Sequence, residues 1–214
     1  LVSSGAIGMG VGKLGLRERP ADIPSKQAAA AVGQCELMYT YDKLFSEYHH
    51  TVAQLLITGD DTVNEKRHNN FINTLNRLLE LDTLPIINEN DTIATDEIVI
   101  GDNDTLAAIV AQSIHADLLV LLSDIDGLYT ADPHKDPNAV LIQRVTEVDK
   151  NILALAGVSS TTQGTGGMVT KLHAAEICLS CGCDMVIANG KNPDNLYDIL
   201  DGKSVGTRFA GGNL

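Results

Sequence analysis

Short apolar runs alternate with helix-like segments along the whole chain, and this alternation limits the possible folds more than any other feature. The runs with the length and composition of strands are Val52–Ile57, Leu84–Ile87, Asp117–Leu122 and Met185–Ala188. Strands that alternate with helices form mostly parallel sheets that helices cover on both faces. We therefore expect one α/β domain over residues 1–214, a three-layer αβα sandwich with a mostly parallel central sheet.

Helical spacing or alanine-rich composition predicts helices between these strands, at Lys26–Tyr48, Asn64–Leu81, Leu106–His115, Asp149–Ala156, Met168–Cys181 and Asp194–Leu200. The run at 117–122 is apolar throughout, which is typical of a central parallel strand buried on both faces. Gly206–Phe209 is predicted to be an edge strand and Ile98–Ile100 a short extra strand. The glycine-rich segment from Gly5 to Gly15 is predicted to be a turn that leads into a short helix.

The charge balance is strongly acidic, with 28 acidic against 15 basic residues and a formal net charge of −13. Such a field repels nucleic acid and anionic membranes, so we expect neither as a main partner. No apolar run approaches the roughly 18 residues of a membrane span, and no secretion signal is visible. These features favour a cytoplasmic protein.

The chain has four cysteines, of which Cys178, Cys181 and Cys183 are grouped. Cys178 and Cys181 have CxxC spacing, but they lie inside a helical pattern and no second pair completes a zinc site. We therefore expect reduced thiols in or near the core and no protein-bound metal.

Two polar clusters, Asn88–Thr92 and Gly101–Thr105, follow an expected strand and open an expected helix. Open α/β sheets place their ligand sites at the carboxyl ends of the strands. Carboxylates and amides gathered there suit an ammonium group, a metal-bound nucleotide, or both.

Two other patterns resemble phosphate-binding motifs only superficially. Gly10–Gly15 satisfies GxGxxG, but Pro20, Pro24 and an alanine-rich helix follow it in place of a second strand. The pair at Gly12 and Lys13 also fails as a Walker loop, because leucine stands where serine or threonine must bind magnesium. We therefore give Lys13 no catalytic role.

Gly164–Lys171 is a better phosphate candidate, because its glycines let backbone N–H groups approach an anion at the start of a helix. Lys171 lies one turn inside that helix, although a flexible loop with an ordinary lysine has the same pattern. Ser123–Thr130 follows the expected central strand and is either a nucleotide contact or a tight turn. Ser3–Ala6 offers a hydroxyl and amides to a carboxylate. This inventory fits phosphoryl transfer.

The motifs taken together resemble the glutamate 5-kinases of the amino acid kinase superfamily, and they occur in that family's order. The segments that carry the resemblance are Ser3–Ile7, Ala31–Gln34, Asn88–Asp91, Gly101–Asp104, Gly127–Thr130, Gly164–Lys171 and Val205–Phe209. The resemblance implies transfer of the γ-phosphoryl group of ATP, with Mg²⁺, to the side-chain carboxylate of L-glutamate. That reaction is the first step of proline biosynthesis.

The resemblance also implies roles for individual residues. Lys171 would contact the transferring phosphoryl group, and Asp104 would organise the catalytic lysines. The positions that match the family's amino-acid site are Ser4, Gly5, Asp91 and Asn103. The positions that match its ATP site are Ser123, Asp124, Thr165, Gly166, Gly167, Met168, Val169, Thr170 and Lys171.

The resemblance further implies a homo-oligomer, a dimer or a tetramer, with feedback inhibition by proline. The family's first strand, which carries a phosphate-contacting lysine, would precede Leu1, and we expect no C-terminal PUA domain. We therefore expect a truncated chain, inactive and poorly stable without that strand.

Three alternatives stay open at this point. The first is another amino acid kinase that acts on a different acceptor, and the second is a non-catalytic subunit that senses a nucleotide or an amino acid. The third is a dinucleotide oxidoreductase that uses Gly10–Gly15.

Overall fold

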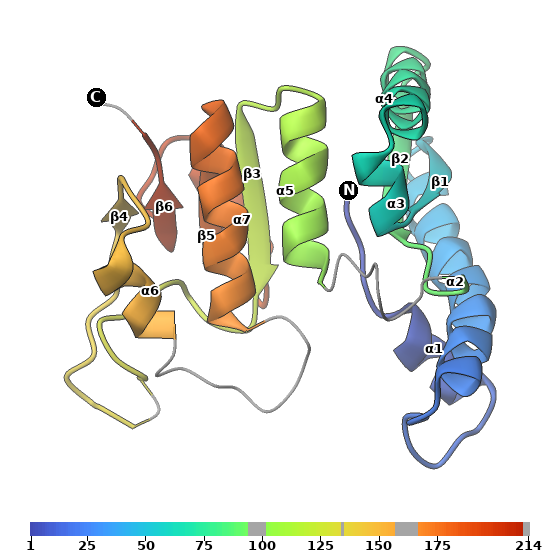
Figure 1. Ribbon diagram of the computed structural model, residues 1–214, viewed down its shortest axis with the longest axis horizontal. Helices are drawn as coiled ribbons and strands as arrows, with labels where there is room; N and C mark the ends of the chain where they lie inside the picture. Colours follow the sequence, from blue (N-terminus) through green and yellow to red (C-terminus); the bar gives the residue numbers. More distant parts are fainter. Residues whose placement is uncertain (94–101, 134, 157–166, 212–214) are drawn as a thin grey trace. The chain divides into compact units, whose positions relative to one another are not determined.

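The computed structural model describes residues 1–93, 102–133, 135–156 and 167–211. Its contacts divide the chain into two compact units, Leu1–Leu106 and Ala107–Leu214, which are described separately below (Figure 1). The α/β class with mostly parallel strand pairs is confirmed. The single domain stays a prediction, and the strand expected at Ile98–Ile100 lies outside the described residues.

The sheet of the first unit is built around one buried strand. β1 (Thr51–Ile57) runs parallel to β2 (Thr83–Glu89), and Val2 forms a parallel bridge to Ile87 of β2. β2 thus has a neighbour on each edge, and its Ile86 and Ile87 side chains are fully buried. The buried strand predicted at 84–87 is confirmed, and its carboxyl end carries the first polar cluster.

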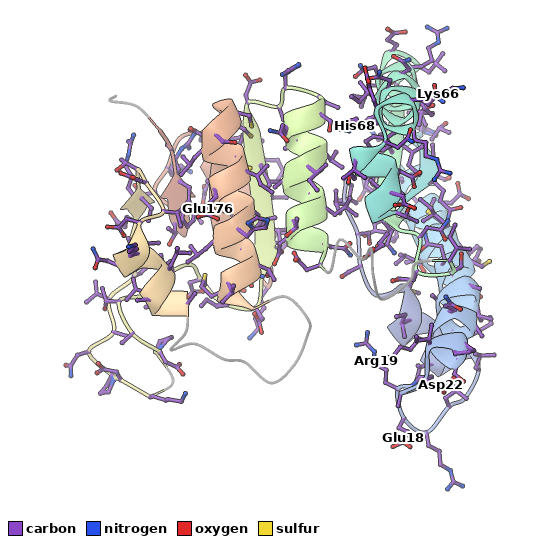
Figure 2. The ribbon with its side chains drawn as sticks, viewed as in Figure 1. Glu18, Arg19, Asp22, Lys66, His68 and Glu176 are labelled. Atoms are coloured by element: carbon purple, nitrogen blue, oxygen red, sulfur yellow. The ribbon has the colours of Figure 1, made fainter. Side chains whose placement is uncertain are left out.

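Helices cover this sheet, and one further helix begins within the second polar cluster. α2 (Ile23–Ser46) packs against β1, and α4 (Glu65–Glu80) packs against β2. Asp22, in the loop before α2, caps that helix by accepting a hydrogen bond from the Ser25 N–H at 2.9 Å (Figure 2). The remaining helices are the short α3 (Gly59–Val63) and α5 (Asn103–Ser113), which begins in the first unit.

The short helix predicted in the glycine-rich segment is confirmed as α1 (Ala6–Lys13), but it begins directly after Gly5, so the turn predicted before it is wrong. Two glycines serve packing between α1 and α2. A Cβ on Gly10 would overlap the carbonyl oxygen of Ala29, and one on Gly33 would overlap the carbonyl oxygen of Ala6. Of the GxGxxG glycines, Gly10 thus serves helix packing, whereas Gly12 has no neighbour there and Gly15 follows the helix with a φ of 66°. Most of the pattern lies inside α1, so it is not the strand-to-helix loop of a dinucleotide site. Lys13 forms a surface ion pair with Glu36 at 2.8 Å.

The sheet of the second unit has the order β3, β5, β6, β4. Its strands are β3 (Leu118–Ser123), β4 (Arg144–Val145), β5 (Asp184–Asn189) and β6 (Thr207–Phe209). β3 pairs with β5 and β4 with β6 in parallel, whereas β5 and β6 are antiparallel.

Two predictions about this sheet are wrong. β6 lies between β5 and β4 and is not an edge strand, because it pairs on both sides. β3 lies at the end of the order and is not central in this sheet, and its Leu122 is 47% exposed.

β5 is the buried centre of the second unit. Four consecutive side chains, Met185–Ala188, are buried, and successive side chains of a strand point to opposite faces. Both faces of β5 are therefore covered. α8 (Asn195–Leu200) packs Ile199 against Val186 and Ala188, and α7 (Met168–Cys181) also packs against β5. α6 (Lys150–Ala156) lies against α7. Within the described segments, no helix combines the length and apolar character needed to cross a membrane.

The cysteines confirm the expectation of thiols in and near the core. All four are free; Cys178 and Cys183 are buried, whereas Cys35 and Cys181 are exposed. Burial, with the neighbouring Cys183 thiol, raises the pKa of Cys178. Burial likewise raises the pKa of Cys183.

We expect a thiol reagent such as DTNB to modify the exposed Cys35 and Cys181 in the native protein. Cys178 and Cys183 should react at least about 100-fold more slowly, because only thiolates attack the reagent and the pKa values of these two buried thiols are raised. Mass spectrometry of the labelled peptides measures this difference. Unfolding in denaturant is the control and should equalise the four rates. Fast native labelling of Cys178 would contradict the buried assignment.

Candidate active site

A network of side-chain amides joins the two polar clusters within the first unit. Asn103, the first residue of α5, donates from Nδ2 to the Ser3 carbonyl oxygen at 2.8 Å and to Asn88 Oδ1 at 3.2 Å. Asn88 lies near the carboxyl end of β2 and is buried. The structure therefore brings together three segments that the sequence singled out: the loop at Ser3, the end of β2 and the start of α5.

α2 contributes two further polar side chains to this network. Gln34 Oε1 accepts a hydrogen bond from Asn88 Nδ2 at 3.1 Å, and the Tyr41 hydroxyl lies 2.8 Å from Ser3 Oγ. Neither residue was predicted as a site residue. The signal for Gln34 was its spacing, since it stands four residues after Ala30 and three before Leu37 on the buried face of α2.

Ser4 and Gly5 lie where α1 begins. Ser4 is exposed, and Gly5 adopts a left-handed conformation with φ of 97° as the residue before the helix. No side chain caps α1 among the described residues. Its first N–H groups are thus available for an anion such as a carboxylate, which the positive end of the helix dipole favours.

Asp91 follows β2 beside the amide network. Its side chain is half-buried, and burial raises the pKa of this carboxyl, while the positive charge of Arg19 partly offsets the shift. Arg19 lies in the loop between α1 and α2 (Figure 2). Asp91, Gln34 and Glu89 line a small cavity of about 10 Å³, which holds about one water-sized group.

The start of α5 is fixed by Asp102. Its carboxylate accepts hydrogen bonds from the Thr105 N–H at 2.7 Å and the Thr105 hydroxyl at 2.9 Å. This cap orients the first turn, which also carries Asp104. The predicted task of Asp104, organising the catalytic lysines, stays a prediction.

In the second unit, the carboxyl ends of β3 and β5 lie next to each other. Ser123 ends β3; its hydroxyl donates to Asp124 Oδ1 at 3.2 Å, and its carbonyl oxygen accepts from the Gly190 N–H at 2.8 Å. A Cβ on Gly190 would lie 3.2 Å from the Leu122 Cβ, so glycine suits this close approach of the two strand ends. Ser123 and Asp124 thus lie at the sheet edge where α/β folds bind ligands.

The loop after β3 is tied to β5 through Asp126. Asn189 Nδ2 donates to Asp126 Oδ1 at 2.7 Å, and the Tyr129 hydroxyl donates to Asp126 Oδ2 at 3.0 Å. Burial, with the Asp126 carboxylate, raises the pKa of Tyr129, so its hydroxyl stays a proton donor. Asn189 was not predicted as a site residue, because its partner lies 63 positions earlier in the chain.

α7 begins at Met168 with Gly167 as its N-cap. No side-chain cap occupies this helix start among the described residues, and the Thr170 hydroxyl donates back to the Gly167 carbonyl oxygen at 2.7 Å. Val169 is exposed, Met168 is buried, and Lys171 is only 8% exposed. Thr165 and Gly166 lie outside the described residues.

No group of three or more histidine, cysteine, aspartate or glutamate side chains that could hold a metal ion occurs within residues 1–93, 102–133, 135–156 and 167–211. The described residues therefore do not form a dedicated magnesium cage. The uncapped start of α7 and its lysine instead suit the phosphates of a nucleotide, which can carry the metal with them.

A profile of the amino acid kinase family matches residues 1–189. The chain is 54% identical to the glutamate 5-kinase of Clostridium tetani over 98% of this chain and 78% of that protein. It is 50% identical to the glutamate 5-kinase of Listeria monocytogenes, over 98% of this chain and 78% of that protein.

Solved structures show the same fold. Carbamate kinase from Giardia lamblia bound to AMP-PNP matches with a TM-score of 0.64 and 16% identity, over 99% of this chain and 84% of that one. UMP kinase from Ureaplasma parvum matches with a TM-score of 0.59 and 14% identity, over 94% of this chain and 75% of that one.

Proposed function

Because the chain belongs to the amino acid kinase family and, within it, to the glutamate 5-kinases, we propose that it phosphorylates the side-chain carboxylate of L-glutamate with ATP. The observation that carries this function is its similarity to glutamate 5-kinases over nearly all of its length. The polar network of the first unit and the phosphate-type helix start of the second support it.

The reaction is a direct transfer. An oxygen of the substrate's side-chain carboxylate forms a bond to the γ-phosphorus of ATP, and the bond from that phosphorus to the bridging oxygen of ADP breaks. The products are L-glutamyl 5-phosphate and ADP. Because the carboxylate is already ionised at neutral pH, the step needs no general base, and catalysis rests on positioning and charge neutralisation.

The residues proposed to hold the amino acid lie in the first unit. Asp91 supplies a negative charge for the substrate ammonium group, and Asn103 supplies a hydrogen-bonding amide. Ser4 and Gly5 stand at the start of α1, whose N–H groups suit a carboxylate. A zwitterionic amino acid thereby meets groups of opposite charge at both of its ends.

The residues proposed to hold ATP lie in the second unit. The start of α7, from Gly167 to Thr170, offers N–H groups to phosphate oxygens, and Lys171 balances negative charge on the transferring group. Ser123 and Asp124 offer polar contacts at the end of β3. Magnesium, when bound with ATP, would neutralise charge on the phosphates.

Replacement of Asp91 by asparagine should raise the KM for L-glutamate at least about tenfold, because a charge-assisted contact to the ammonium group is lost. The KM for ATP should stay unchanged. In the native protein the KM for L-glutamate should rise as the pH falls through the raised pKa of Asp91, because protonation removes the negative charge of its carboxylate. This rise should come in addition to the rise caused by titration of the substrate's own carboxylate. The variant should lack this extra rise. Steady-state kinetics over pH measures both effects.

The control is the exposed carboxylate Asp42 on α2, for which Asp42→Asn should leave both KM values unchanged. An Asp91→Asn enzyme with native affinity for glutamate would remove Asp91 from the site.

The decisive test of the function is an assay of the full-length protein with ATP and magnesium on L-glutamate, N-acetylglutamate and aspartate, with hydroxylamine to trap any acyl phosphate. A hydroxamate with L-glutamate is the expected result. Product with another acceptor alone would point to a different amino acid kinase, and no product with any acceptor would favour a sensing subunit. Three further properties stay predictions. Inhibition by proline can be checked in the same assay, a dimer or tetramer by light scattering, and a cytoplasmic location by cell fractionation.

A further inference from the structure

A buried glutamine on α2 has no direct part in the reaction proposed above, yet it is tied to residues that have one. We propose that Gln34 is a positioning residue for the amino-acid site. Through Asn88 it sets the orientation of the Asn103 amide, so that Asn103 presents its carbonyl oxygen to the ammonium group of the substrate. This inference rests on the proposed function and adds to it the atom that recognises the amino group.

The orientation of Asn88 follows from a backbone group. The Glu89 N–H can only donate, and it points at one side-chain atom of Asn88 from 2.9 Å. That atom must therefore be the acceptor, Oδ1. The other end of the Asn88 amide is then Nδ2, and the Gln34 atom that lies 3.1 Å from it must be an oxygen.

The orientation of Asn103 follows in the same way from a backbone carbonyl. The Ser3 oxygen can only accept, so the Asn103 atom at 2.8 Å from it must be Nδ2. The same nitrogen also lies 3.2 Å from Asn88 Oδ1. Both of its N–H groups are thus engaged, and the carbonyl oxygen is what the Asn103 amide retains for a ligand.

Gln34 adds to the contacts that hold this arrangement, because a flipped Asn88 would turn its Oδ1 toward Gln34 Oε1. A flipped Asn88 would point N–H groups at the Glu89 N–H and at Asn103 Nδ2, and both contacts would be repulsive. Gln34 itself is only 7% exposed. Its Nε2 has no hydrogen-bond partner among the described residues, so its burial is costly and packing alone does not explain it.

A fixed carbonyl oxygen has a definite chemical preference. It accepts hydrogen bonds from the N–H groups of an ammonium and repels a carboxylate. A site built around such a contact discriminates strongly against an analogue that lacks the donor, because the buried acceptor is then left unpaired. Glutarate, which is L-glutamate without its amino group, is the matching probe.

The test compares the ratio of kcat/KM for L-glutamate to that for glutarate in the full-length protein and in Gln34→Met, a substitution of similar volume. We expect this ratio to fall at least about tenfold in the variant, with an unchanged KM for ATP, because Asn88 and, through it, the Asn103 amide are then held by fewer hydrogen bonds. Thr40→Val is the control on α2: it removes an exposed hydroxyl that donates to the Glu36 carbonyl oxygen at 2.8 Å, outside the amide network, so the ratio should not change.

Combination with Asn103→Ala adds a second criterion. If Gln34 acts through Asn103, the effects of Gln34→Met and Asn103→Ala on the ratio are strongly non-additive in the double variant. Additive effects, or a native ratio in Gln34→Met, would overturn the proposal. A wild-type protein that phosphorylates glutarate but not L-glutamate, or neither, would instead overturn the proposed function on which it rests.

A measurement without any variant keeps the proposal testable if Gln34→Met does not fold. In ¹⁵N-labelled wild-type protein, the Asn103 side-chain NH₂ protons should exchange with solvent at least about tenfold more slowly than those of the exposed Asn73. Fast exchange of both Asn103 protons would show that the amide is not held, and the proposal would be wrong.

Discussion

Replacement of Lys171 by alanine is expected to lower kcat about 10²- to 10³-fold, the range measured when one charge-stabilising donor is removed from a transition state. Lys171 lies in the first turn of α7, directly after the helix start proposed to hold the ATP phosphates. The proposed contact from Lys171 stabilises the transition state more than bound ATP, so the loss should fall on kcat more than on the KM for ATP. Steady-state kinetics with a coupled ADP assay measures the split.

Two controls separate chemistry from folding in that experiment. Lys203→Ala removes an exposed lysine that pairs with Asp198 at 2.6 Å, and kcat should stay native. Thermal unfolding of the Lys171→Ala protein is the second control: only a variant that is still folded at the assay temperature ties the loss of kcat to Lys171 itself. Turnover within about threefold of the wild type would refute the catalytic role of Lys171.

Replacement of Gly33 by alanine should lower the free energy of unfolding by about 3 kcal/mol. A Cβ at this position would overlap the Ala6 carbonyl oxygen, and its other neighbours are also backbone atoms of α1. Backbone cannot move aside as the end of a side chain can, so α1 and α2 must separate. The gain in helix propensity from alanine, about 1 kcal/mol, is smaller than this cost. Chemical denaturation monitored by circular dichroism measures the difference.

Gly12 provides the matched substitution. It lies on the exposed side of α1, and a Cβ there would have no neighbour within 4 Å. Gly12→Ala should therefore raise the free energy of unfolding by about 0.5–1 kcal/mol. Equal effects of the two substitutions would mean that the helices do not meet as described. Because Ala6 follows the proposed substrate-binding residues Ser4 and Gly5, Gly33→Ala should also weaken glutamate binding.

The positions of the main strands are predictable because each depends on a local pattern. The apolar runs that became β1, β2, β3 and β5 need no distant partner to be recognised. β6 is different, because its pairing with β5 and β4 depends on segments far away in the chain. The local pattern therefore predicted a strand correctly but gave it the wrong place in the sheet.

The candidate site shows the same division. Asn103 could be singled out because it opens a helix within an acidic, amide-rich cluster. Gln34 lies in one of the segments that carry the resemblance, but its contact could not be predicted, because its partner Asn88 is 54 positions away. The GxGxxG segment was read as a turn for a related reason: glycine lowers helix propensity locally, and the contact with α2 that requires Gly10 is not local.

Thr207 has a consequence for folding during synthesis. Its hydroxyl accepts from the Leu128 N–H at 2.8 Å and donates to the Ile142 carbonyl oxygen at 2.6 Å, and β4 has no other strand neighbour than β6 among the described residues. The loop after β3 and the segment before β4 can therefore form these two hydrogen bonds only when Thr207 is present. A ribosome that has not yet released Thr207 holds a chain whose β3 and β5 can already pair, while the loop after β3 still lacks its hydrogen bond to Thr207.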